Sequence, residues 1–164
     1  MSKIKDIHIY LALLLYSILI LFIVSPDSYT HDLFSRCDSA WFFMCGKAWM
    51  NGMTPYVDFA DSKGPFLWLI YGIGYLLSST DYIGIFWLSC IWYSITFFFC
   101  YKIGALLLQS RRKGFAVAIL MAIPYFWHYS HYEIRAEDWC HPFVVSSFYV
   151  LLKLITTPEK SLEK

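Results

Sequence analysis

The chain has 164 residues, of which 59% are hydrophobic, 21% are aromatic and only 15% are charged. A soluble domain of this length rarely carries so much apolar and aromatic surface, so the composition indicates an integral membrane protein that lies in a lipid bilayer. The formal net charge of +1 provides no overall basic field, and the sequence contains neither a zinc-finger spacing nor a glycine-rich phosphate loop. We therefore expect the chain to have no nucleic acid partner.

The first apolar run, "IHIYLALLLYSILILFIV", covers residues 7–24. Its length suffices for one helix across the ~30 Å hydrocarbon layer of a bilayer. Lys3 and Lys5 precede the run, and the polar "SPDSYT" follows it without a small-residue cleavage site. These flanks predict an uncleaved transmembrane anchor whose N-terminus lies in the cytoplasm.

Residues 25–81 are predicted to form an external loop, and "DSAWFFMCGKAWMNG" within it predicts an amphipathic helix over 39–50. Asp38 or Ser39 is expected to cap the start of this helix, and Gly52 is expected to end it. A short tryptophan-rich helix of this kind usually lies in the membrane interface. The residues expected on its apolar face are Trp41, Cys45, Ala48 and Trp49.

A second short helix is predicted over 66–77, after the turn that Gly64 and Pro65 indicate. This apolar run is shorter than the roughly 20 residues that a helix needs to cross a bilayer. The preceding polar residues of "DSKGP" would therefore lie at the membrane surface. We interpret 66–77 as a re-entrant or interfacial helix.

Three further spanning helices are predicted, over 82–108, 115–132 and 142–155. The first is long enough to cross with tilt, and Pro124 is expected to kink the second. The polar segments "QSRRKG" and "HYEIRAEDWCH" separate them. The sequence thus predicts an all-α membrane protein in which residues 1–164 form a single membrane domain with about four transmembrane helices.

The distribution of charge supports this topology. If 66–77 does not cross, nine of the 13 lysines and arginines lie on the cytoplasmic side, as the positive-inside rule requires. Nine of the 12 acidic residues then lie outside. We therefore expect both termini to be cytoplasmic, and the external face to carry an acidic surface rimmed by aromatic residues.

The order of motifs on this external face resembles the first external loop of the GT-C superfamily of membrane glycosyltransferases. The likeness is greatest to the branch with protein O-mannosyltransferases and aminoarabinose transferases. It is carried by Asp38 after the first span, by "GMTPYVD" at 52–58 and by "KGPF" at 63–66. "EIRAEDWCHPF" resembles the acidic second external loop of that superfamily, so the resemblance covers nearly the whole chain after Pro26.

This resemblance implies a module that transfers a sugar from a polyprenyl-phosphate-linked donor to a hydroxyl acceptor at the outer face of the membrane. The acceptor must lose a proton as it attacks, and Asp38 is the residue that matches the catalytic base. The leaving phosphate is anionic, and Lys63 is the residue placed to bind it. Asp61 with Glu137 or Asp138 would hold a divalent metal cation through oxygen ligands, as in some relatives.

Plainer roles are open for each of these residues. Asp38 can serve only as a helix cap, Lys63 can extend from an interfacial helix to water, and Asp61 can be a solvated loop acid or a partner of Lys63. Asp58 is interpreted as a structural turn acid. A zinc site is disfavoured because no recognised zinc spacing is complete. The residues that such a site would use are His128, His131, Glu133 and His141.

The chain is short for this superfamily, whose members have more membrane spans. We therefore expect it to be the N-terminal portion of a longer enzyme, with further transmembrane helices as partners, and to be inactive alone if truncated. The expected location is a bacterial inner (plasma) membrane. The alternative function is a non-catalytic four-helix membrane protein that acts as an assembly partner or scaffold; a transporter is disfavoured because the spans carry almost no ionisable residues at mid-bilayer.

Overall fold

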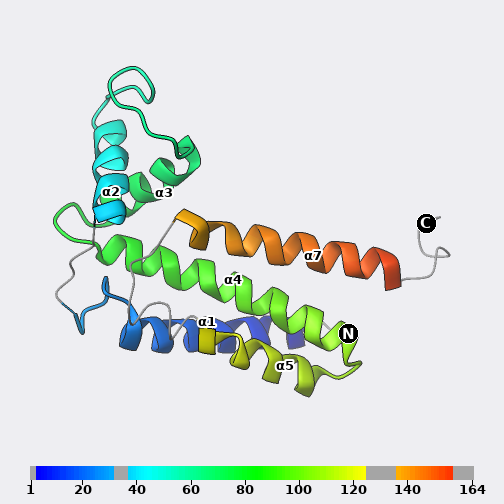
Figure 1. Cartoon of the computed structure of the whole chain (residues 1–164). Helices are drawn as coiled ribbons and strands as arrows, with labels where there is room; N and C mark the ends of the chain where they lie inside the picture. The colour runs from blue at the N-terminus through cyan, green and yellow to red at the C-terminus, as the bar shows by residue number, and fades with distance from the viewer. Residues whose placement is uncertain (1–2, 32–36, 125–135, 157–164) are drawn as a thin grey trace.

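The structure is a computed structural model that describes residues 3–31, 37–124 and 136–156 (Figure 1). This described part is all-helical apart from its connecting loops, which confirms the predicted fold class. The elements in chain order are α1 (Lys3–Val24), α2 (Cys37–Met50), α3 (Pro65–Leu77), α4 (Ile83–Leu107), α5 (Arg111–Leu120), a 3-10 helix η1 (Ala136–Cys140) and α7 (His141–Thr156).

Three stretches of the described residues are long and apolar enough to cross a membrane. They are Asp6–Val24 in α1, Ile83–Leu107 in α4 and Ala136–Thr156, which joins η1 to α7. Helix α3 has 13 residues and is about 20 Å long, so it is too short to cross.

The third predicted span, 115–132, is only partly within the described residues. Helix α5 starts earlier than predicted and ends at Leu120, Met121 forms a turn, and residues 122–124 are helical again. Pro124 explains this break, because a proline has no N–H to donate and its ring clashes with the carbonyl four residues before it. That carbonyl belongs to Leu120, the last residue of α5. Residues 125–132 lie outside the described residues.

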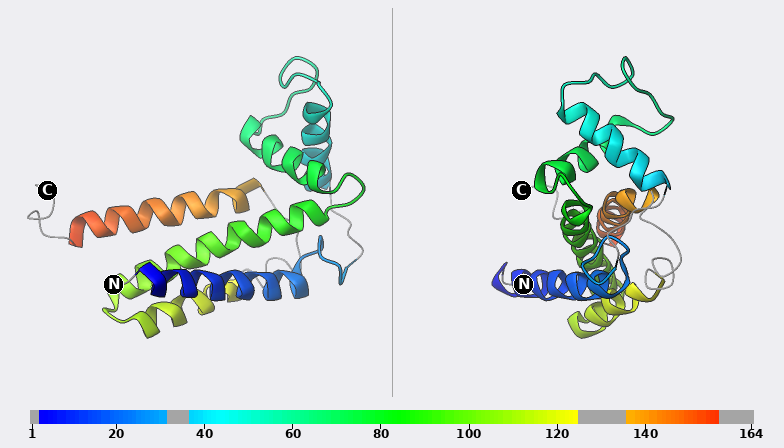
Figure 2. Two further views of the ribbon diagram at one scale, coloured as in Figure 1. Left: turned by 180° about the vertical axis from the view of Figure 1, so that it is seen from behind. Right: turned by 90° about the vertical axis from the view of Figure 1, so that its left-hand side faces the viewer.

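Helix α4 is the centre of the bundle (Figures 1 and 2). Helices α1, α3, α5 and α7 all pack against it. Helices α1 and α5 run in one direction and α4 and α7 in the other, so the start of α1, the end of α4 and the start of α5 lie together at one end. The pair α2 and α3 lies at the opposite end, where α4 begins.

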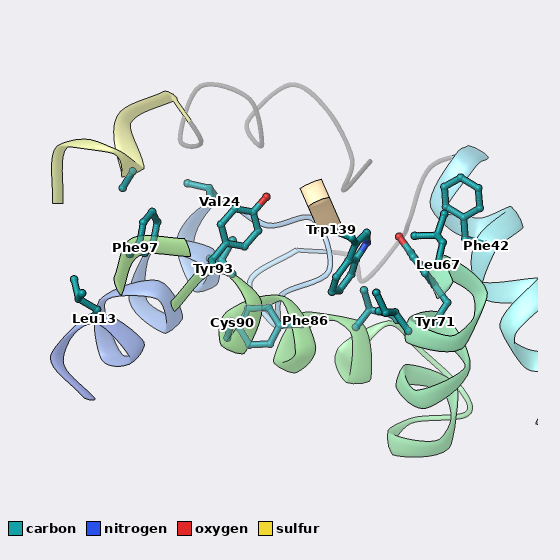
Figure 3. Packing of buried hydrophobic residues seen from close by; sticks show 14 of the residues in the cluster. Leu13, Val24, Phe42, Leu67, Tyr71, Phe86, Cys90, Tyr93, Phe97 and Trp139 are labelled. Carbon is teal, nitrogen blue, oxygen red and sulfur yellow. The ribbon is translucent and has the colours of Figure 1, made fainter. Parts of the chain in front are cut away.

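Helix α4 contributes buried side chains, including Phe86, Cys90 and Tyr93, to the core that Figure 3 shows in part. Hydrogen bonds join the helices inside this apolar environment. The hydroxyl of Ser17 donates to the carbonyl oxygen of Cys90 at 2.8 Å, and the hydroxyl of Tyr16 donates to the carbonyl oxygen of Ile119 at 3.0 Å. Such bonds hold membrane helices together where water cannot compete.

A close approach of backbones joins α2 to α3. A Cβ atom added to Gly46 would lie 2.7 Å from the carbonyl carbon of Tyr71 and 2.8 Å from the carbonyl oxygen of Trp68. Gly46 therefore decides which face of α2 is buried. Of the residues predicted on its apolar face, Cys45 is buried, Ala48 and Trp49 are partly buried and Trp41 is exposed. The buried residues of α2 are Ser39, Phe42, Phe43, Cys45 and Gly46.

Candidate functional site

The loop between α2 and α3 folds back onto α3 and so fixes where α3 begins. Gly52 has a φ of 92° and follows the end of α2, as predicted. The carboxylate of Asp58 accepts a hydrogen bond from the backbone N–H of Thr54 at 2.7 Å, which matches a structural turn acid. The rings of Tyr56 and Phe59 pack on Trp68, with centroids 4.9 and 5.1 Å from its own.

Asp61 is held by α2 and by its own loop. The indole N–H of Trp41 donates to Asp61 Oδ2 at 2.6 Å, and the Ser62 hydroxyl donates to Oδ1 at 3.0 Å. Partial burial acts to raise the pKa of Asp61, but the hydrogen bonds from Ser62 and Trp41 outweigh it and hold the pKa below its ordinary value. Asp61 is therefore ionised at neutral pH, and each of its carboxylate oxygens already accepts a hydrogen bond from a side chain.

Lys63 and Glu137 meet although 74 residues separate them. Lys63 Nζ lies 3.4 Å from Glu137 Oε1, and the two side chains are 40% and 71% exposed. A hydrogen bond from the Tyr56 hydroxyl to the carbonyl oxygen of Lys63, at 3.3 Å, fixes the backbone at this point. The ion pair joins the loop before α3 to the 3-10 helix η1, so the two acidic loops identified in the sequence lie side by side here.

The position of η1 is set by α4. The indole N–H of Trp92 donates to the carbonyl oxygen of Trp139 at 2.8 Å, and the two rings lie 5.6 Å apart. Trp139 is buried and also packs against Tyr71, beside which Figure 3 shows it. Asp138 is buried too, with Oδ1 3.8 Å from Nδ1 of His141. These contacts turn Glu137 outward toward Lys63.

A pocket of about 350 Å³ lies between the start of α3 and the η1–α7 junction. Lys63 and Glu137 stand at its polar side, and most of its remaining lining is apolar. Phe66 and Phe143 are each about half exposed, so the pocket opens onto apolar surface. The residues that line it are Lys63, Gly64, Phe66, Leu67, Ala136, Glu137, Trp139, Cys140 and Phe143.

Asp38 is exposed in the first turn of α2. The helix begins at Cys37, so Asp38 lies inside the helix and is not its N-cap, nor is Ser39. A carboxylate in a first turn interacts favourably with the helix dipole. Asp38 is three residues before Trp41, whose side chain binds Asp61, so Asp38 and Trp41 lie on the same face of α2.

The metal prediction remains a prediction. Within residues 3–31, 37–124 and 136–156, no group of three His, Cys, Asp or Glu side chains is placed to hold a metal ion. Asp61 accepts hydrogen bonds from Trp41 and Ser62, and Glu137 faces Lys63. This arrangement does not fit a divalent cation. Of the histidines weighed for zinc, His128 and His131 lie outside the described residues, as does Glu133.

Several residues of this region were not identified from the sequence. Trp41 binds Asp61, Trp92 positions η1, and Cys140 and Phe143 line the pocket. The available signal for Trp41 was its place near Asp38 in a short helix of the acidic external loop. The sequence carries no comparable signal for the other three, because their roles depend on how η1 packs against α4.

Together, fold and pocket define a helical membrane protein with an apolar pocket and a lysine at one end of its bundle. Residues 62–162 match the family model of dolichyl-phosphate-mannose-protein mannosyltransferases. The chain belongs to this family, whose members are membrane glycosyltransferases of the GT-C type, which confirms the resemblance inferred from the sequence. The match includes Lys63, Glu137 and Asp138, whereas Asp38 and Asp61 precede it. Neither a curated protein nor a solved structure matches the chain.

Proposed function

We propose that the chain is the part of a membrane glycosyltransferase that binds a polyprenyl-phosphate-linked sugar donor, at the external face of a bacterial inner membrane, for transfer to a hydroxyl acceptor. The observation that carries the proposal is Lys63 at the side of the apolar pocket. A lipid phosphate needs a cation for its head group next to an apolar surface for its first isoprene units. Phe66, Leu67 and Phe143 supply that surface.

The Lys63–Glu137 pair suits a residue that must bind a ligand and release it. Exposed ion pairs contribute only about 0–1 kcal/mol to stability, so a phosphate can replace Glu137 as the partner of Lys63 with little loss of free energy. Until the donor arrives, Glu137 keeps the ammonium group of Lys63 directed over the pocket.

Trp139 offers a second polar contact. Its indole N–H is buried and has no hydrogen-bond partner within the described part of the chain. Buried donors are nearly always paired, because an unpaired one costs about 1–3 kcal/mol. Trp139 also lines the pocket, so an oxygen of the bound donor is a suitable acceptor for this N–H.

Asp38 is the proposed general base. Its carboxylate takes the proton from the acceptor hydroxyl while the acceptor oxygen bonds to the anomeric carbon of the sugar. The bond between that carbon and the phosphate oxygen breaks, and its electron pair leaves with the polyprenyl phosphate. Lys63 stabilises the negative charge that develops there. Asp38 is exposed, so an acceptor can reach it.

Protection of Cys140 from labelling tests donor binding directly. Cys140 lines the pocket and is exposed, whereas Cys45, Cys90 and Cys100 are buried. In a Cys37→Ser background, a polyprenyl phosphate should slow maleimide labelling of Cys140. The Lys63→Met variant should need about ten times more lipid for the same protection. Lys47→Met is the matched control, because Lys47 lies on α2 against the ring of Tyr75 and does not line the pocket.

A second experiment separates catalysis from binding. Asp38→Asn keeps the size of the side chain but removes the base. The rate of sugar transfer by the full-length protein should therefore fall by roughly 10²–10⁴-fold. Protection of Cys140 should be unchanged. Labelling that the lipid phosphate does not slow, or that it slows equally in the Lys63→Met variant, would contradict the assignment of the pocket. Full transfer activity in Asp38→Asn would contradict the role of Asp38.

A further inference from the structure

A cluster of charged residues joins the start of α1, the last turns of α4 and the start of α5. Figure 1 shows these helix ends at the end of the bundle opposite to α2 and α3. The carboxylate of Asp6 accepts a hydrogen bond from Lys102 Nζ at 3.1 Å and another from Nη2 of Arg111. Arg111 Nε donates to the hydroxyl of Tyr101 at 3.2 Å. The cluster thus joins α1, the last turns of α4 and the start of α5.

A pocket of about 310 Å³ lies beside this cluster and is distinct from the one at Lys63. It reaches from α4 and α5 to α7, which contributes Tyr149. Its polar groups are those that donate hydrogen bonds to an anion, namely an ammonium, a guanidinium, two hydroxyls and an amide. The residues that line it are Lys102, Ala105, Leu106, Gln109, Ser110, Arg111 and Tyr149.

The two cations retain capacity for a ligand. An ammonium group has three donor hydrogens and a guanidinium has five, and the contacts to Asp6 and Tyr101 use only some of them. One carboxylate faces two positive charges here, so the cluster keeps a net positive charge. Arg112 and Lys113 follow directly in the chain, and the lining residues include no acid.

We propose that this pocket binds the phosphate group of an anionic phospholipid at the membrane face opposite to the candidate site. Basic pockets between transmembrane helices on one membrane face bind anionic lipid head groups in this way. A lipid fits better than a free phosphate ion because Ala105 and Leu106 form an apolar floor. Helix α7, which carries Tyr149, also exposes Leu151 and Leu154 for acyl chains. The proposal does not depend on the proposed function.

Native mass spectrometry of the chain released from detergent micelles tests the proposal. The probes are phosphatidylglycerol, phosphatidylcholine with the same acyl chains, and inorganic phosphate. Phosphatidylglycerol should bind at least about tenfold more tightly than phosphatidylcholine, and Arg111→Gln should weaken its binding about tenfold. Lys113→Gln removes the same charge from an exposed side chain outside the pocket and should change the affinity by less than about twofold.

Asp6→Asn provides a test in which the lipid is expected to bind more tightly, not more weakly. It removes the carboxylate that both cations now face, so binding of phosphatidylglycerol should become tighter. Equal binding of the two lipids, equal losses in Arg111→Gln and Lys113→Gln, or weaker binding in Asp6→Asn would each overturn the pocket assignment. Inorganic phosphate that binds as tightly as phosphatidylglycerol and displaces it would identify a site for free anions and overturn the choice of a lipid.

Discussion

The contact of Gly46 with α3 allows a quantitative prediction, because a Cβ atom at this position would clash with the backbone of α3. It would lie 2.7 and 2.8 Å from backbone atoms of Tyr71 and Trp68, and it would also clash with the backbone nitrogen of Gly72. Carbon atoms attract each other best at about 3.5–4.0 Å, so the two helices would have to separate by about 1 Å in Gly46→Ala. Backbone atoms cannot move aside as the end of a flexible side chain can.

The expected loss of stability follows from two opposing effects. Overpacking of this kind typically costs about 1–3 kcal/mol, and three backbone contacts at once place Gly46→Ala near the upper end of that range. Alanine is a better helix former than glycine by about 1 kcal/mol, which offsets part of the cost. The net destabilisation should be about 2 kcal/mol, or roughly a 30-fold shift in the unfolding equilibrium.

Denaturation of the chain in detergent micelles, followed by tryptophan fluorescence, measures this change. Met44→Ala is the control, because Met44 is 58% exposed on the same helix and its removal should alter the free energy of unfolding by no more than about 0.5 kcal/mol. Separation of α2 from α3 should also disturb the hydrogen bond between Trp41 and Asp61. A Gly46→Ala variant as stable as the parent would show that α2 and α3 do not approach this closely.

Three further predictions use the same denaturation measurement. The pKa of Asp81 is held below its ordinary value by hydrogen bonds from the Ser78 hydroxyl and the backbone N–H of Ile83. The ionised form of Asp81 therefore adds stability above about pH 4, and this stability is lost as the pH falls through the lowered pKa. Asp81→Asn should be less stable than the parent at pH 7, and the difference should shrink near pH 3. Ser17→Ala removes the bond to the Cys90 carbonyl and should cost about 1 kcal/mol, and no loss would mean that this bond adds nothing to helix association. Trp92→Phe leaves the Trp139 carbonyl without its donor and should cost about 1–3 kcal/mol; it should also reduce carbodiimide cross-linking of Lys63 to Glu137, and unchanged cross-linking would contradict the role of Trp92 in positioning η1.

Local pattern and length were sufficient to predict most helices. The short helix predicted over 66–77 is Pro65–Leu77 in the structure, and the spans predicted over 82–108 and 142–155 are Ile83–Leu107 and His141–Thr156. Apolar runs and polar breaks are properties of neighbouring residues, so they can be read along the chain. The helix predicted over 115–132 is interrupted at Met121, where the kink expected from Pro124 falls, although the apolar run continues through it.

The site was less predictable because its contacts join distant parts of the chain. Lys63 and Glu137 were both identified as candidates, but nothing in the sequence pairs one with the other across 74 residues. Trp41 was predicted on the apolar face of α2, but the sequence carries no signal that Gly46 decides which side approaches α3. Which side chains form the pocket depends on that approach and on the bond from Trp92 to Trp139.

The ion pair of the site is exposed, whereas the side chains that support the site, here called its frame, are buried. This difference is suited to ligand exchange. Side chains of the frame, such as Trp68 and Trp139, are buried and packed, so their positions depend on contacts that are costly to break. Lys63 and Glu137 are exposed and joined by one weak ion pair. A ligand phosphate therefore competes with a single exposed carboxylate and leaves the packing of α3, α4 and η1 undisturbed. A pocket with a rigid wall and a replaceable ion pair can bind and release a lipid phosphate repeatedly without refolding.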